Sequence, residues 1–157
     1  MKYSKSNILY QDNPAFGIII KLIFVMVPGV LLLGSIFYFS TGENTDATVL
    51  FVEAVLTGLI FRSVFPRSYQ VYEDHLCIVL GWPFSFNIGF SEIKSIAITN
   101  KTTLSINFIT KFAMNYVEIA KHRGFSVAIT PRNYKDFVKY ANEGFSRWVK
   151  ESKQISD

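Results

Sequence analysis

The sequence predicts an α+β membrane protein, with an N-terminal transmembrane helical hairpin over residues 16–65 and an antiparallel β-barrel or sandwich after it, capped by a C-terminal amphipathic helix. The chain has 157 residues, half of them hydrophobic, and its mean hydropathy of +0.26 is high for a soluble domain. The apolar residues are concentrated in residues 16–65. Beyond them the pattern changes to short strands and then to a helical period.

The first predicted span covers residues 16–40. It contains Leu22–Phe39, a run of 18 residues without a charge. A helix over residues 16–40 is about 37 Å long, enough to cross a bilayer. A secretory signal peptide would have a shorter apolar core followed by small residues, and this pattern is not seen here. Pro28 and Gly29 predict a kink in the middle of the helix.

The second predicted span covers residues 47–65 and follows the polar turn Thr41–Asp46. It contains Glu53, whose carboxylate costs about 2.5–3.5 kcal/mol at the bilayer centre. The short turn makes the two helices antiparallel neighbours, and pairing about its middle places Glu53 level with Gly34 and Ser35. One interpretation of Glu53 is a carboxylate that handles protons or ions, or that links another subunit. The other is a group toward the outer interface that is either protonated or bonded to Ser35.

Basic residues predict the orientation of the hairpin. They lie before or at the start of the first span and at the end of the second, at Lys2, Lys5, Lys21, Arg62 and Arg67. The turn between the spans carries Glu43 and Asp46 and no Lys or Arg. The positive-inside rule therefore places both termini in the cytoplasm and the turn outside. Residues 1–15 are expected to be a cytoplasmic N-terminal segment.

Short strands are predicted from residue 68 onward, over residues 69–72, 76–80, 84–88, 93–98, 116–120 and 125–129. The stretch Leu104–Met114 has no clear period. We expect Leu104–Phe108 to be a core strand, with Ile106, Phe108 and also Thr110 facing inward. The alternative for the rest of the stretch is an exposed apolar patch around Phe112, suited to a protein partner or to shallow membrane insertion.

The last element is predicted to be an amphipathic helix. Thr130 is a good N-cap residue, and Pro131 suits the first helical position. Apolar residues then recur at spacings of three and four, at Tyr134, Phe137, Val138, Ala141, Phe145, Trp148 and Val149. The cytoplasmic domain is expected to cover residues 68–149, and residues 150–157 are expected to be a disordered tail.

Four short patterns, taken in order, resemble a known family. They are Y-x-x-Y-E-D-x-L at residues 69–76, F-S-E-I-K-S-I at 90–96, V-E-I at 117–119 and V-A-I-T-P-R-N-Y-K-D-F at 127–137. This order is similar to the bacterial pleckstrin-homology-like (PH-like) domain that follows two N-terminal membrane helices in many bacterial membrane proteins. The resemblance implies a seven-stranded barrel-like sandwich with a C-terminal helix, and it implies no established activity.

The sequence gives no sign of an enzyme. The single cysteine, Cys77, excludes an intramolecular disulfide and a multi-cysteine zinc site. His75 and His122 fall in separate turns, so we expect no metal site. No glycine-rich loop opens a helix, so we expect no nucleotide cofactor. The part after Pro66 carries 12 Lys and Arg against 8 Asp and Glu, a mild excess that does not suggest nucleic acid as a partner.

Basic residues near the predicted helix start offer a surface for anionic lipid. The candidates are Lys121 and Arg123 in one turn and Arg132 and Lys135 at the helix start. Each contributes about 1 kcal/mol beside an anionic membrane surface, although scattered solubilising charge gives the same composition. We predict a membrane-anchored, non-catalytic interaction or scaffolding module that acts through homo-oligomers or a protein partner. The alternatives are an accessory subunit of a transporter or channel that uses Glu53, and a module that binds anionic lipid.

Overall fold

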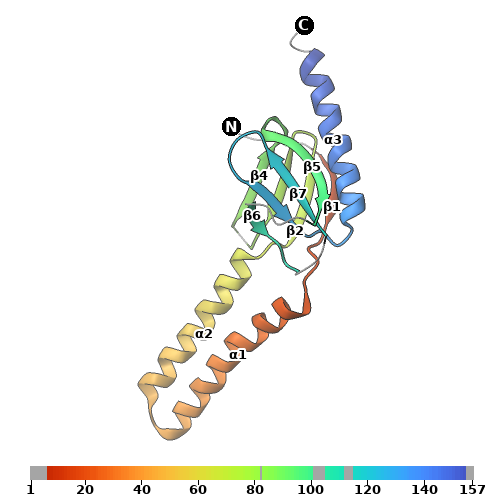
Figure 1. Cartoon of the computed structure of the whole chain (residues 1–157). Helices are drawn as coiled ribbons and strands as arrows, with labels where there is room; N and C mark the ends of the chain where they lie inside the picture. The colour runs from red at the N-terminus through yellow and green to blue at the C-terminus, as the bar shows by residue number, and fades with distance from the viewer. Residues whose placement is uncertain (1–6, 82, 101–104, 112–114, 155–157) are drawn as a thin grey trace.

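The computed structural model describes residues 7–81, 83–100, 105–111 and 115–154. It consists of a long helical hairpin and a β-sandwich with one C-terminal helix (Figure 1). The hairpin is formed by α1 (Ile18–Thr41) and α2 (Asn44–Val64). These helices confirm the predicted hairpin, with bounds shifted by one to three residues. Both are long and apolar enough to cross a membrane by length and composition.

The turn between α1 and α2 depends on Gly42. Its φ of 84° lies in the left-handed region that favours glycine. In this conformation the N–H of Gly42 donates to the carbonyl of Phe39, and the N–H of Glu43 donates to the carbonyl of Tyr38. These bonds satisfy carbonyl groups at the end of α1 and let α2 begin two residues after Gly42.

The described residues contain eight strands, which form two sheets of four. The first sheet has the order β1-β2-β3-β4 and is antiparallel, with β1 at Ile8–Asp12, β2 at Ser68–Tyr72, β3 at His75–Val79 and β4 at Ser85–Gly89. The second has the order β5-β7-β8-β6, with β5 at Ile93–Thr99, β7 at Tyr116–Lys121, β8 at Ser126–Ile129 and β6 at Ser105–Phe108. Because β6 runs parallel to β8, this sheet is mixed. The sheets form an open sandwich, and a short 3-10 helix, η1 (Phe90–Glu92), connects them.

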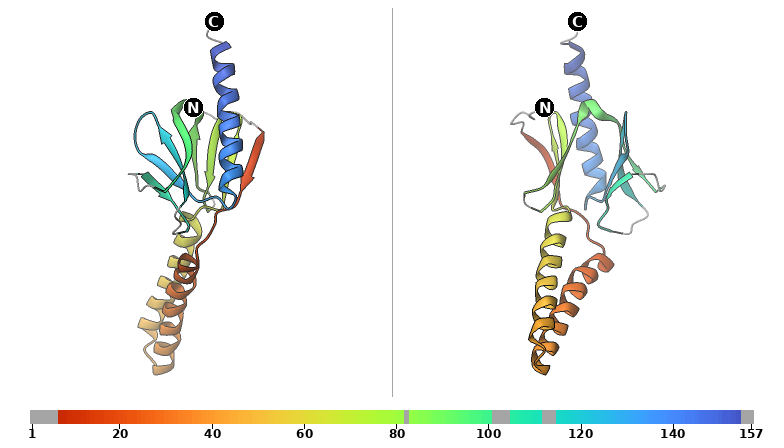
Figure 2. Two further views of the ribbon diagram at one scale, coloured as in Figure 1. Left: turned by 45° about the vertical axis from the view of Figure 1, so that its right-hand side comes forward. Right: turned by 90° about the vertical axis from the view of Figure 1, so that its left-hand side faces the viewer.

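Strand β1 belongs to the domain although it precedes the hairpin in the chain. It pairs antiparallel with β2, with Gln11 opposite Gln70 and Asp12 opposite Tyr69. No strand was predicted in residues 1–15. The hairpin is therefore inserted between two neighbouring strands of one sheet, and both of its ends leave from the same side of the domain (Figure 2).

Helix α3 (Tyr134–Gln154) packs between the two sheets and contacts β1, β2, β5 and β7 (Figure 2). Its apolar stripe supplies Phe137 and Ala141 to the core, which both sheets share. The inward side chains of the core strands are almost fully buried, among them Tyr69, Val71, Leu76, Ile78, Ile88, Val117, Ile119, Val127 and Ile129. The predicted capping helix is confirmed, and it closes the open side of the sandwich.

The ends of α3 differ from those predicted. The helix begins at Tyr134, and Thr130 does not cap it, because the Thr130 hydroxyl is buried and accepts a hydrogen bond from the Thr110 N–H at 3.0 Å. The carboxylate of Asp12 lies at the helix start instead and accepts from the Asn133 N–H at 2.6 Å. At the other end α3 reaches Gln154, so residues 150–154 are helical and the predicted disordered tail is wrong there. Residues 155–157 lie outside the described part of the chain.

Candidate functional site

Backbone hydrogen bonds tie both ends of the hairpin to the domain. On the way into α1, the Ala15 N–H donates to the Thr130 carbonyl at 2.9 Å, and the Gly17 N–H donates to the Thr110 carbonyl at 2.8 Å. On the way out of α2, the Gly81 N–H donates to the Ser63 carbonyl at 3.1 Å. We call this region, where residues 13–17 and 63–67 meet the sandwich, the joint.

A buried cluster of hydroxyl groups supports the joint from inside the domain. The Thr110 hydroxyl donates to the Ala15 carbonyl at 3.0 Å and lies 3.0 Å from the Thr130 hydroxyl. The Tyr69 hydroxyl donates to the Phe108 carbonyl at 2.9 Å. Burial raises the pKa of Tyr69 to about 12. The cluster thus connects β2, β6 and β8 to the segment that enters α1.

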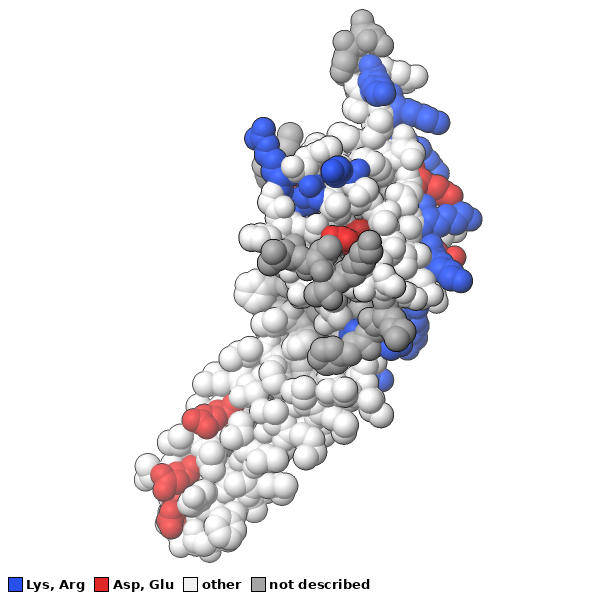
Figure 3. Space-filling model, viewed as in Figure 1, with Lys and Arg blue, Asp and Glu red and all other residues white. Residues whose placement is uncertain are grey.

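Exposed basic side chains surround the joint. They are Lys21, Arg62, Arg67, Lys111, Arg132 and Lys135. On the face seen in Figure 3, the charged side chains of the hairpin toward its far end are acidic, whereas the domain carries Lys and Arg together with some acidic residues. Among the described side chains, ion pairs join Asp74 to His75 and Lys121 to Glu92, and neither includes a basic residue of the joint. The joint is therefore a positively charged collar at one end of an apolar hairpin.

The four basic residues singled out in the sequence fall into two groups. Lys121 and Arg123 lie at the β7–β8 turn, whereas Arg132 and Lys135 follow the other end of β8. The end of β8 is bonded to the chain that enters α1, so only Arg132 and Lys135 lie beside the joint. Lys121 forms an ion pair of 2.7 Å with Glu92. The structure thus does not bring the four together on one surface.

The predicted apolar patch falls partly outside what the structure describes. Phe112 is one of the residues that are not described. Ser105–Phe108 is a strand, as expected, but Ile106 lies at the sheet edge and is 40% exposed, so its predicted inward burial is wrong. Two exposed phenylalanines of the domain, Phe84 and Phe125, were not predicted as surface residues. Phe125 directly follows Gly124, which has the positive φ of a turn residue. A residue next to a turn glycine is expected at the surface, and this was the sequence signal that could have identified Phe125.

Inside the hairpin, Ser35 and Glu53 do not meet. The Ser35 hydroxyl donates to the Ala47 carbonyl at 2.7 Å, because the helices are offset from the predicted register. Glu53 lies on the exposed face of α2 and lines a shallow groove of about 580 Å³ together with Thr45 and Thr48. The predicted pairing of Glu53 with Ser35 is therefore wrong, and this carboxyl group points away from α1.

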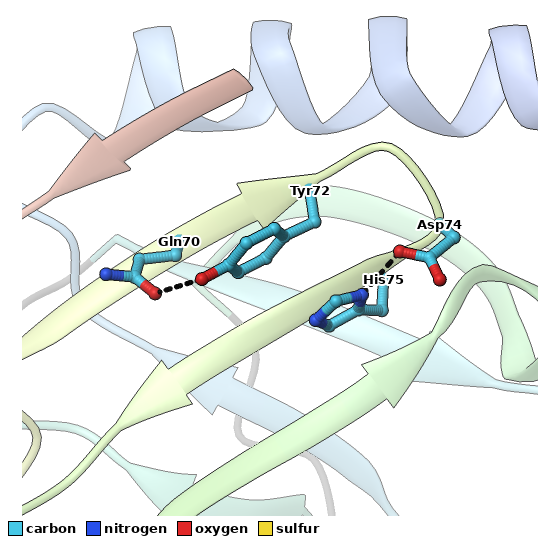
Figure 4. A network of polar contacts seen from close by, with 4 residues as sticks. All are labelled: Gln70, Tyr72, Asp74 and His75. Atoms are coloured by element: carbon cyan, nitrogen blue, oxygen red, sulfur yellow. Dashed lines mark hydrogen bonds and ion pairs between the residues drawn. The ribbon is translucent and has the colours of Figure 1, made fainter. Parts of the chain in front are cut away.

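A polar network on the first sheet is the nearest approach to a catalytic arrangement. The Tyr72 hydroxyl donates to Gln70 Oε1 at 2.9 Å, and His75 Nδ1 lies 2.5 Å from Asp74 Oδ1 (Figure 4). His75 is buried at the start of β3, not in a surface turn, and its ring stacks on Tyr72 with 4.4 Å between centroids. Burial raises the pKa of the Cys77 thiol, which disfavours the reactive thiolate. The described residues contain no group of three His, Cys, Asp or Glu that could hold a metal ion.

Comparison with known proteins identifies the domain. Residues 67–142 match the family model described as the bacterial PH domain, a range that runs from β2 into α3 and leaves out β1 and the hairpin. No curated protein and no solved structure matches the chain. PH domains are generally non-catalytic binding modules that mediate protein or lipid interactions. The chain therefore carries a bacterial PH domain at residues 67–142, preceded by two apolar helices of membrane-spanning length.

Proposed function

We propose that this protein is a membrane-anchored, non-catalytic interaction module that displays its bacterial PH domain at the cytoplasmic face of the inner membrane. The observation that carries the proposal is the pairing of β1 with β2 across the hairpin. Because one sheet holds both ends of the hairpin, α1 and α2 must leave and return on the same side of the membrane. Two antiparallel spans of 24 and 21 residues meet this requirement.

The charges support the cytoplasmic side for the domain. The basic collar of the joint lies where the hairpin meets the domain, and Glu43 and Asp46 lie near the hairpin tip. Lys and Arg are retained on the cytoplasmic side of membrane helices, and anionic lipid headgroups attract them there. A domain seated on this collar leaves the β7–β8 turn, with Arg123 and Phe125, directed away from the bilayer.

We further propose that the module works as a homo-oligomer formed through the exposed face of α2. A lipid-facing carboxyl group near the middle of a span is costly. In a symmetric pair with its axis along the membrane normal, Glu53 would meet Glu53 of a second copy, and two protonated carboxyl groups can hydrogen-bond to each other. The hydroxyl groups of Thr45 and Thr48 lie on the same face.

The exposed position of Glu53 on α2 also favours one alternative function, an accessory subunit of a transporter or channel that uses Glu53. Replacing Glu53 with Gln separates the two functions, because the amide keeps hydrogen bonding and loses the titratable proton. An anchor carrying Glu53→Gln should insert and oligomerise normally. A transport subunit should lose transport at normal protein levels.

The anchor is tested with the full chain in native membranes, since a fragment that starts at Pro66 lacks the edge strand β1. We expect the protein to stay in the membrane pellet after alkaline carbonate extraction. In mild detergent, the mass of the protein should correspond to more than one copy. Release by carbonate would overturn the anchor, and a monomeric mass at all concentrations would overturn the oligomer.

A further inference from the structure

A cavity of about 460 Å³ lies at the joint, beside the ends of α1 and α2 that are nearest the domain. Its lining comes from the segment that enters α1, the second turn of α1, the last turns of α2 and the segment that follows α2, among them Phe16, Phe24, Phe61, Phe65, Arg62 and Arg67. The two helices diverge toward the domain (Figure 2). The volume lies in the range of small-molecule binding pockets.

Aromatic rings form the apolar wall of the cavity. Phe24 is at the centre of the cluster, with ring centroids 4.4 Å from Phe65, 5.1 Å from Phe61 and 6.0 Å from Phe16. Gly58 leaves open space beside them, because a Cβ built at this position would meet no other heavy atom within 4 Å. The wall is thus suited to an extended hydrocarbon chain.

Two arginines supply the polar part of the lining. Arg62 and Arg67 are both exposed, and neither forms an ion pair with an acidic side chain that the structure describes. A guanidinium group binds a phosphate group through two parallel hydrogen bonds, which suits it to a phosphodiester. Arg62 lies in the last turn of α2, at the level expected for lipid headgroups if the hairpin spans the membrane.

We infer that this cavity binds one anionic phospholipid of the cytoplasmic leaflet, with its phosphate on Arg62 and Arg67 and an acyl chain against the phenylalanine rings. The inference rests on the proposed membrane anchoring. A free phosphate ion would use the two arginines and leave the aromatic wall without a role. A membrane lipid carries both the anionic group and the hydrocarbon chain, and it reaches the cavity laterally from the bilayer.

The test is native mass spectrometry of the full chain in detergent, titrated separately with phosphatidylglycerol, phosphatidylcholine and inorganic phosphate. Two headgroup-level cations, each strengthening anionic-lipid binding about fivefold, predict about a 25-fold preference for phosphatidylglycerol over phosphatidylcholine. The double variant Arg62→Gln/Arg67→Gln should lose this preference. The matched control Lys139→Gln/Lys150→Gln removes two exposed charges of α3 and should keep it.

A second pair of variants tests the cavity without changing charge. Gly58→Leu should fill it and weaken the binding of phosphatidylglycerol at least tenfold, a loss typical of a blocked apolar pocket. Gly29→Leu is the control, because Gly29 also has open space around it but does not line the cavity. Both replacements put a better helix former in place of glycine.

Three results would overturn the inference: equal binding of the two lipids, an undiminished preference in the Arg62→Gln/Arg67→Gln variant, or full binding by Gly58→Leu. Binding of inorganic phosphate as strong as that of phosphatidylglycerol would also overturn it, in favour of a simple ion site. Carbonate extraction of the native membranes from which the protein is purified separates this inference from the proposed function. A chain that resists extraction and shows no lipid preference refutes only the lipid site, whereas an extracted chain refutes the anchor.

Discussion

Replacing Gly81 with alanine should break the contact between the hairpin and the domain. Gly81 is buried against the end of α2, and a Cβ there would lie 1.9 Å from the Arg62 carbonyl oxygen and 2.5 Å from Ser63 Cα. Ordinary contacts begin at 3.4 Å, so one backbone segment must move by 3.4 − 1.9, or 1.5 Å. Both clashing atoms belong to the main chain, which cannot turn aside as a flexible side chain can.

The cost of this movement has two parts. The hydrogen bond from the Gly81 N–H to the Ser63 carbonyl is lost, at about 0.5–1.5 kcal/mol. Displacing packed backbone adds about 1–3 kcal/mol, as in other overpacked sites. The free energy of unfolding of the domain should therefore fall by about 1.5–4.5 kcal/mol. The midpoint of thermal unfolding should fall by about 4–8 °C per kcal/mol.

Thermal unfolding of the full chain in detergent, followed by near-ultraviolet circular dichroism, measures this change. Gly58→Ala is the matched control, because the added methyl group meets no atom within 4 Å and glycine is a poor helix former. We expect Gly58→Ala to unfold at the wild-type temperature or slightly above it. Equal midpoints for Gly81→Ala and Gly58→Ala would refute the close contact at the joint.

Three further predictions concern single side chains. Burial raises the pKa of Tyr69 from 10.0 to about 12. The folded state therefore favours the neutral phenol, and stability that is complete below pH 10 should fall by about 2–3 kcal/mol as the pH rises through 12. Tyr69→Phe should remove this pH dependence in urea unfolding measured at several alkaline pH values. Asp12→Ala removes the acceptor for the Asn13 and Asn133 N–H groups and should cost about 1–2 kcal/mol in the same assay, whereas Asp12→Asn should retain part of this stability. Glu53→Leu should leave membrane insertion intact and shift the mass of the protein in mild detergent to that of one copy. The control variant Glu53→Gln should remain oligomeric. An oligomeric Glu53→Leu variant would contradict the proposed α2 contact.

The hairpin and most of the sandwich could be predicted because their signals are local. An uncharged run of 18 residues at Leu22–Phe39 and short alternating stretches after residue 68 are visible within windows of a few residues. Strand β1 could not be predicted in the same way. Its partner β2 begins after the whole hairpin, and neither a turn nor a short loop links the two strands in the sequence. The parallel pairing of β6 with β8 could not be predicted from local patterns either, because β7 lies between these two strands in the sequence.

The start of α3 shows how a distant residue can replace a local signal. Thr130 and Pro131 form a good capping pattern by themselves. In the fold the Thr130 hydroxyl is occupied by Thr110, and Asp12 reaches the helix start from the end of β1. The Asp12 carboxylate also accepts a hydrogen bond from the Asn13 N–H.

The candidate site was predicted only in part. Arg62 and Arg67 indicated the orientation of the hairpin, but their grouping with Phe16 and Phe24 depends on how the helices diverge at the joint. Arg123 and Arg132 are nine positions apart in the sequence, and an intervening strand carries them to opposite ends of β8. The length of the turn likewise does not determine the register of α1 against α2. In the fold this register places the Ser35 hydroxyl against the Ala47 carbonyl.

Labelling of single cysteines in intact cells tests the central claim most directly, namely that the hairpin is inserted in the domain and both of its ends lie in the cytoplasm. In a Cys77→Ser background, exposed positions before the hairpin, at its tip and in the domain are replaced in turn, as Asn7→Cys, Asn44→Cys and Arg123→Cys. A membrane-impermeant thiol reagent should label Asn44→Cys in intact cells, and the other two only after the membrane is permeabilised. Labelling of Asn7→Cys from outside while Arg123→Cys stays protected would place β1 and β2 on opposite sides of the membrane and contradict the account.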